Sequence, residues 1–109
     1  MKTFYGDTFI SKEELEAEEI TYPIKLEYYK IVNDSIRNNQ YNIKYGIDIV
    51  KTEYKKDNTN VEEEKLKYIT NDERQVDDIL EMLKQNEVTP IGVKDVISDY
   101  LNEVLFKYR

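Results

Sequence analysis

Apolar and polar side chains alternate in the first half of the chain, and apolar side chains recur at helical spacing in the second half. The alternation is clearest over residues 41–50, where tyrosine or isoleucine occupies every second position up to Ile49. A less regular alternation runs from Ile24 to Val32, and a weaker one from Val61 to Ile69. A period of two places one side of a strand against a core, so the sequence predicts three strands.

Polar runs separate these strands. Residues 33–39 are rich in Asn, Asp and Ser, whose side chains hydrogen-bond their own backbone, so the first two strands are predicted to form a hairpin with a long loop. A second polar run, residues 55–60, precedes the third strand. Because three glutamates and a lysine at residues 62–65 discourage further pairing, the third strand is predicted to lie at the edge of the sheet.

Two amphipathic helices are predicted after the strands. Thr70 and Glu73 have the spacing of a capping box, and Thr89 with Pro90 is typical of an N-cap and a first helical position. The first apolar stripe runs from Val76 to Leu83 and the second from Val93 to Tyr108. The predicted fold class is therefore α+β, with a small antiparallel sheet of about three strands and both helices packed on one face.

The first 21 residues differ in composition from the rest. They hold five glutamates and few aliphatic side chains, which predicts an acidic, flexible N-terminal arm ahead of a single α+β domain over residues 22–109. Ser11 and Glu14 have capping-box spacing, so a short helix is one prediction for this arm.

Composition excludes several kinds of chemistry. The chain has no cysteine and no histidine, which rules out thiol nucleophiles, disulfides, metal sites built on these residues and any Ser-His relay. Its three glycines are far apart, so there is no glycine-rich phosphate loop. Asp95 and Asp99 lie one helical turn apart, but such a pair is usually a solvated helix face. No catalytic, cofactor-binding or metal-binding residue is predicted, and we expect a protein that is not an enzyme.

Charge narrows the choice of partner. The net charge of −7 and the pI near 4.7 argue against a protein that binds nucleic acid through its phosphates, and favour a partner protein with a basic surface. No apolar run is long enough for a membrane span, and the first residues lack the apolar run of a signal peptide. The expected location is the cytoplasm, with no membrane partner.

Ten tyrosines are the least usual feature of the composition, and Tyr28 and Tyr29 must face opposite sides of one strand. An exposed ring among carboxylates can hold Lys or Arg side chains of a partner, although tyrosine also suits half-buried strand positions. The stripe of the last helix is longer than a three-stranded sheet can cover, so either the arm or a second copy of the chain is expected to cover its end. The candidate partner-binding residues are the glutamates of the arm, the outward tyrosine and the end of the last helix: Glu13, Glu14, Glu16, Glu18, Glu19, Tyr29, Leu101, Leu105, Phe106 and Tyr108.

Several short motifs stand out along the chain: the segments 45–51 (YGIDIVK), 68–72 (YITND) and 86–91 (NEVTPI), together with Asp95-Val96 and 99–101 (DYL). In these motifs the chain resembles a small family of uncharacterised domains from low-GC Gram-positive bacteria. The resemblance covers about residues 26–101 and implies the strand, strand, strand, helix, helix order without any activity. Gly92 departs from the pattern, because members often have a histidine after the Pro-Ile pair.

The sequence leaves two hypotheses of function from different classes. One is a small regulatory or adaptor protein that acts by binding another protein. The alternative is an acidic inhibitor, encoded by a mobile element, whose carboxylates mimic nucleic acid and occupy the basic groove of a nucleic-acid-binding protein.

Overall fold

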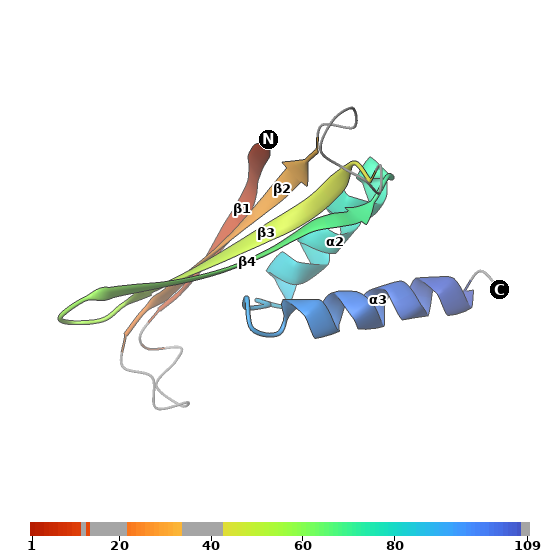
Figure 1. The fold of residues 1–109 in the computed structure, drawn as a ribbon. Coiled ribbons are helices and arrows are strands. Elements are labelled where there is room, and N and C mark those ends of the chain that lie inside the picture. The colour runs from red at the N-terminus through yellow and green to blue at the C-terminus, as the bar shows by residue number, and fades with distance from the viewer. Residues whose placement is uncertain (12, 14–21, 34–42, 108–109) are drawn as a thin grey trace.

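Over the residues that are described, the structure is a four-stranded antiparallel sheet with two helices on one side. It is a computed structural model that describes residues 1–11, 13, 22–33 and 43–107, with the backbone alone from residue 104 onward. In chain order the elements are β1 (Lys2–Ile10), β2 (Ile24–Val32), β3 (Tyr45–Tyr54), β4 (Thr59–Thr70), α2 (Glu73–Gln85) and α3 (Val93–Lys107). The strand order is β1-β2-β3-β4, and Figure 1 shows both helices below the sheet. The predicted α+β class is confirmed.

The sheet has four strands, where the sequence predicted about three. The additional strand is β1, which pairs antiparallel with β2 and lies in the segment interpreted as an acidic arm. Its register with β2 shifts between Phe4 and Gly6, so the alternation of its side chains is interrupted at Tyr5. The rest of the predicted arm, apart from Ser11 and Glu13, lies outside the described residues. The hairpin of β2 and β3 and the edge position of β4 are both confirmed.

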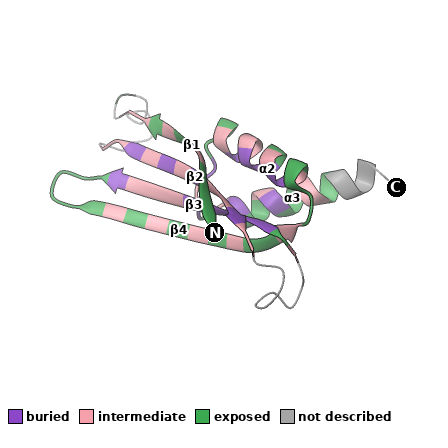
Figure 2. Cartoon of the chain, turned by 90° about the horizontal axis from the view of Figure 1, so that it is seen from above, coloured by how far each residue is buried: buried purple, intermediate pink, exposed green. Residues whose placement is uncertain are grey.

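The core lies between α2 and the two central strands. Leu26 and Tyr28 of β2 and Ile47 and Ile49 of β3 are fully buried. They pack in one cluster with the apolar stripe of α2, and Figure 2 shows buried positions on all three elements. The stripe is the one predicted: Val76, Ile79, Leu80 and Leu83.

Polar contacts join α2 to β1 and β2 through two side chains one helical turn apart. The Tyr5 hydroxyl donates to Glu81 Oε2 at 2.5 Å, and Lys30 Nζ lies 2.7 Å from Asp77 Oδ1. The Tyr28 side chain is buried, and its hydroxyl donates a hydrogen bond to the Val88 carbonyl at 3.0 Å. This hydrogen bond attaches the link between the two helices, residues 86–92, to the central strand β2.

Both helices begin later than predicted. The N-cap of α2 is Asp72, whose side chain accepts from the Arg74 amide; Thr70 still belongs to β4 and its hydroxyl accepts from the Asp72 amide. The helix α3 begins at Val93, because the Gly92 amide bonds to the Thr89 carbonyl and closes a turn around Pro90. Val93 and Ile97 of α3 join the core. Among the described residues, no helix is long and apolar enough to cross a membrane.

Gly46 is required by a close approach between β3 and β4. Tyr45 pairs with Thr70 and Ile47 pairs with Leu66, so β4 has more residues than β3 between these pairs and bulges. A Cβ at position 46 would lie 2.2 Å from the Leu66 carbonyl oxygen and 2.3 Å from that of Lys67. Asn33 Nδ2 donates to the Lys67 carbonyl at 2.7 Å, which satisfies one acceptor of the bulge.

Replacing Gly46 with alanine should destabilise the protein by about 3 kcal/mol, because the added methyl meets backbone that cannot rotate away. Chemical denaturation of Gly46→Ala beside the parent chain measures this. Gly92→Ala is the matched control, since a Cβ there meets nothing within 4 Å, and its effect should stay below about 1 kcal/mol. Equal effects of the two substitutions would contradict the close approach at Gly46.

Glu87 directly follows the C-cap residue of α2, a position that glycine commonly occupies. Its φ is 51°, its amide bonds to the Lys84 carbonyl, and the Val88 amide bonds to the Leu83 carbonyl, which together form a Schellman motif. A Cβ in this left-handed conformation costs about 1 kcal/mol. Glu87→Gly should therefore raise the free energy of unfolding by about 0.5–1 kcal/mol, whereas Glu87→Ala, which loses the charge but keeps the Cβ, should give no gain. Chemical denaturation measures both variants, and a gain with alanine instead would assign the effect to charge.

Candidate functional site

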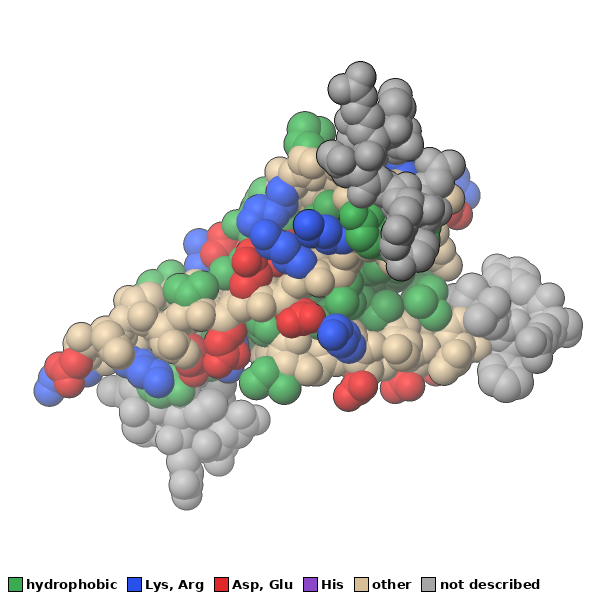
Figure 3. All heavy atoms as spheres, in the orientation of Figure 1, with side chains coloured by type: hydrophobic (Ala, Val, Ile, Leu, Met, Phe, Trp, Pro, Cys, Tyr) green, Lys and Arg blue, Asp and Glu red, His purple; other side chains and the backbone are tan. Residues whose placement is uncertain are grey.

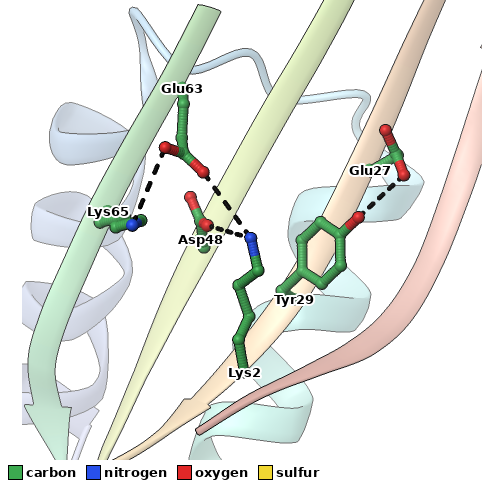
Figure 4. Close-up of polar contacts among 6 residues, drawn as sticks. All are labelled: Lys2, Glu27, Tyr29, Asp48, Glu63 and Lys65. Carbon is green, nitrogen blue, oxygen red and sulfur yellow. Dashed lines mark hydrogen bonds and ion pairs between the residues drawn. The ribbon is translucent and has the colours of Figure 1, made fainter.

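One face of the sheet is covered by neither of the described helices, α2 and α3. We call it the open face, and it carries side chains that alternate with the buried ones: Lys2, Phe4, Asp7 and Phe9 of β1, Lys25, Glu27 and Tyr29 of β2, Asp48, Val50 and Thr52 of β3, and Val61, Glu63 and Lys65 of β4. Hydrophobic, basic and acidic side chains are intermixed over the strands (Figure 3). The close-up of this face shows both helices behind the sheet (Figure 4).

Asp48 is the central polar residue of the open face. It lies opposite Tyr29 on β2 and opposite Lys65 on β4, and its side chain is fully buried. Lys2 Nζ lies 3.2 Å from Asp48 Oδ2 and 3.8 Å from Glu63 Oε2, and Lys65 Nζ lies 3.9 Å from Glu63 Oε1 (Figure 4). Two carboxyl groups and two ammonium groups therefore form one cluster across three strands.

The environment of Asp48 disfavours its charge. Burial raises the pKa of the Asp48 carboxyl, the neighbouring Glu63 raises this pKa further, and Lys2 lowers it without reversing the shift. Among the described residues, Oδ1 of Asp48 receives no hydrogen bond. An ionised Glu63 has no proton to donate, so it supplies a partner for Oδ1 only when the pair holds a proton.

Aromatic rings border this cluster. The Tyr29 ring centroid lies 4.3 Å from Lys2 Nζ, and Phe4 meets Tyr29 edge-on with ring centroids 5.6 Å apart. The Tyr29 hydroxyl donates to Glu27 Oε2 at 2.8 Å. Burial and this bond to a carboxylate raise the pKa of Tyr29 to about 12, so Tyr29 stays neutral and is a poor proton donor or acceptor at neutral pH.

A second polar cluster lies on the helix side of the sheet, near the β3–β4 hairpin. Glu53 is buried and accepts from the Tyr22 hydroxyl at 2.8 Å and from Asn60 Nδ2 at 2.7 Å. The bond from Asn60 is the main reason that the pKa of Glu53 is lowered. Both carboxylate oxygens of Glu53 therefore have donors, whereas Oε2 of the nearby Glu62 is buried without a hydrogen-bond partner among the described residues.

Two of the predicted partner-binding residues, Tyr29 and Leu101, lie on opposite sides of the sheet. Tyr29 lies on the open face, whereas Leu101 is half-buried and packs beside the core on the opposite side of the sheet. Glu13 is exposed. The other arm glutamates, Glu14, Glu16, Glu18 and Glu19, and also Tyr108 lie outside the described residues, as do the side chains of Leu105 and Phe106. Their roles stay predictions.

The sequence interpretation missed Lys2, Asp48, Glu63 and Lys65. One signal was present, because Asp48 is the only charged residue within the run from Tyr45 to Val50 that becomes the most buried strand. Glu63 and Lys65 were interpreted only as charges that protect an edge. Among the described residues, no group of three or more Asp or Glu side chains is arranged to hold a metal ion. The cluster is best suited to bind a cationic group.

Comparison with known proteins gives a family but no activity. The model of the Family of unknown function (DUF6514) matches residues 7–103. No curated protein and no solved structure matches the chain.

Asp48→Asn should change how stability depends on pH. Because the folded-state pKa of Asp48 lies above its usual value of 3.8, the folded protein holds this proton more tightly than the unfolded chain does. The contribution of Asp48 to stability is therefore complete below about pH 3.8 and is lost as the pH rises through the folded-state pKa. At pH 7 Asp48→Asn should be more stable than the parent by about 1 kcal/mol, and this advantage should shrink toward pH 4.

Thermal unfolding between pH 4 and pH 8 measures the effect. Asp7→Asn is the control, because Asp7 is an exposed carboxylate of the same face with a Lys25 partner at 3.9 Å, and its effect should stay within about 0.5 kcal/mol. If Asp48→Asn is instead less stable than the parent at pH 7, the ionised Asp48 is a net stabilising group.

Proposed function

The chain belongs to DUF6514, a family of unknown function, and we propose that it is a small non-enzymatic protein that acts by binding another protein through the open face of its sheet. The role would be regulatory or that of an adaptor. Its cytoplasmic location and its origin in low-GC Gram-positive bacteria stay predictions.

The observation that carries the proposal is the exposure of large apolar side chains on the open face. The exposed fractions are 52% for Phe4, 61% for Phe9 and 59% for Val61. Single exposed apolar residues are ordinary, but these come from both edge strands of one face that no described helix covers. Aromatic side chains set among polar groups are typical of protein-binding surfaces.

Charged groups on the same face favour a protein partner over nucleic acid. The face carries lysines and carboxylates in alternation, and they pair with one another, as Lys25 does with Asp7 and Lys65 with Glu63. A nucleic-acid surface would need an unbroken basic patch. The buried Asp48 carboxyl at the centre gives the face an acceptor that suits a basic group of a partner.

The alternative, a mimic of nucleic acid, is supported by one feature of α3. Three exposed carboxylates are spaced four residues apart along α3, at Asp95, Asp99 and Glu103. Four residues correspond to about 6 Å along a helix. A mimic would place such a row in the basic groove of a nucleic-acid-binding protein. This row is on α3, away from the apolar side chains of the open face, so the two functions can be tested separately.

Site-specific photocrosslinking should capture a protein at the open face. With a photoreactive phenylalanine at position 9 in the full chain, incubated with an extract of the source cells, we expect one protein adduct that mass spectrometry identifies. The matched control places the same group at position 91. Ile91 is 83% exposed, but it belongs to the segment that connects α2 to α3 and not to the open face. That position should give no such adduct.

The same experiment separates the two functions. An adduct at position 9 should disappear with Phe4→Ser, whereas binding by a mimic should disappear when salt is raised, because it depends on many ion pairs. Equal labelling at positions 9 and 91, or none at position 9, would remove the open face as the binding surface. Labelling that is lost with Asp95→Asn and Asp99→Asn instead would favour the mimic.

A further inference from the structure

The Lys2 ammonium occupies a small cation site on the open face. Three groups surround Nζ: Asp48 Oδ2 at 3.2 Å, Glu63 Oε2 at 3.8 Å and the Tyr29 ring centroid at 4.3 Å (Figure 4). Two carboxyl groups and an aromatic face are the combination that recognises ammonium and guanidinium groups in proteins. The groups come from β2, β3 and β4, so the paired strands set their spacing.

Lys2 leaves this site incompletely satisfied. It bonds Oδ2 of Asp48, while Oδ1 receives no hydrogen bond among the described residues although the Asp48 side chain is fully buried. A buried acceptor without a donor is unfavourable, and it is uncommon in folded proteins. The site therefore has the capacity for a ligand that donates more than one hydrogen bond in a fixed geometry.

Lys2 itself is replaceable. Its side chain is 42% exposed, and it approaches the carboxyl groups from β1, an edge strand. A lysine side chain regains conformational entropy when it is released, and an arginine in its place keeps a positive charge beside the buried Asp48 carboxyl. An arginine has a planar group with five donors and bonds carboxylates in pairs, so it can serve both oxygens of Asp48 or bridge Asp48 and Glu63.

We propose that Asp48, Glu63 and Tyr29 form a recognition site for an arginine side chain of the partner protein, which takes the place of the Lys2 ammonium. This inference rests on the proposed function, because it names the chemistry of the partner that binds the open face. The Phe4 ring beside Tyr29 supplies the apolar contact next to the arginine, and the exposed Phe9 lies farther along β1, opposite Lys25. Lys2 then acts as an internal competitor that lowers affinity for weakly matched partners.

The test is a titration of the full isotope-labelled chain with three short peptides, Gly-Arg-Gly, Gly-Lys-Gly and Gly-citrulline-Gly, monitored by NMR chemical shifts. The arginine peptide should shift the amides around Asp48 and Glu63 most, and the neutral citrulline peptide should shift them least. Lys2→Ala should tighten binding of the arginine peptide about fivefold by removing the competitor. Lys25→Ala is the matched control, because Lys25 pairs with Asp7 on the same face, and it should leave the affinity unchanged.

Two substitutions on the carboxyl groups complete the test. Asp48→Asn and Glu63→Gln should each weaken binding of the arginine peptide about tenfold, and Glu63 is 40% exposed, so its replacement does not endanger the fold. Equal binding of the citrulline peptide, no tightening with Lys2→Ala, or shifts centred on the carboxylates of α3 would each overturn the arginine site.

The failure of this inference can be told from the failure of the proposed function. A protein adduct at position 9 without binding of the arginine peptide would mean that the open face binds a partner but does not recognise an arginine side chain. Arginine binding at Asp48 without an adduct would remove the proposed function and leave a cation site.

Discussion

The packing of α2 against β2 and β3 is the contact on which the rest of the structure depends. It buries Leu26, Tyr28, Ile47 and Ile49 under the stripe of α2, and each fully buried side chain of this size contributes roughly 1.5–3 kcal/mol. The contact also determines where the C-terminal part of the chain lies. Because the Tyr28 hydroxyl bonds the Val88 carbonyl, the sheet fixes the link between the helices, and α3 begins on the same side as α2.

A single helical layer leaves the two faces of the sheet in different physical environments. On the helix side, the buried Glu53 has a donor for each of its two carboxylate oxygens. On the open face, the fully buried Asp48 has Lys2 as the donor to Oδ2 and, among the described residues, no donor to Oδ1. The pKa of Asp48 is raised, first because burial removes water from the carboxyl and second because Glu63 lies beside it. The open acceptor of Asp48 and the exposed Phe4, Phe9 and Val61 are the reasons for proposing that a partner binds the open face.

Much of the fold could be predicted from the sequence, and the errors have physical reasons. The strands β2, β3 and β4 and both helices are indicated by periodicity. The strand β1 was missed because the bulge at Tyr5 interrupts its alternation and because its edge position leaves Phe4 and Phe9 exposed. Thr70 and Asp72 are both good N-capping residues. Because Thr70 pairs with Tyr45 in the sheet, Asp72 is the N-cap of α2. In α3, the turn around Pro90 moves the first helical residue to Val93.

The candidate site was less predictable, because it depends on the register between strands. Of its members, Tyr29 was singled out from its neighbour Tyr28, since adjacent strand residues must face opposite sides. Nothing local brings Lys2, Asp48 and Glu63 together: Lys2 belongs to a strand without a clear pattern, and Glu63 is one of three consecutive glutamates. A bulge in one strand shifts the neighbours of every later residue, so the irregular pairings of β1 with β2 and of β3 with β4 help to decide which charges meet. A carboxylate between Ile47 and Ile49 could be recognised from the sequence as unusual. Side chains on other strands determine which group, such as a lysine, a proton or a partner, interacts with that carboxylate.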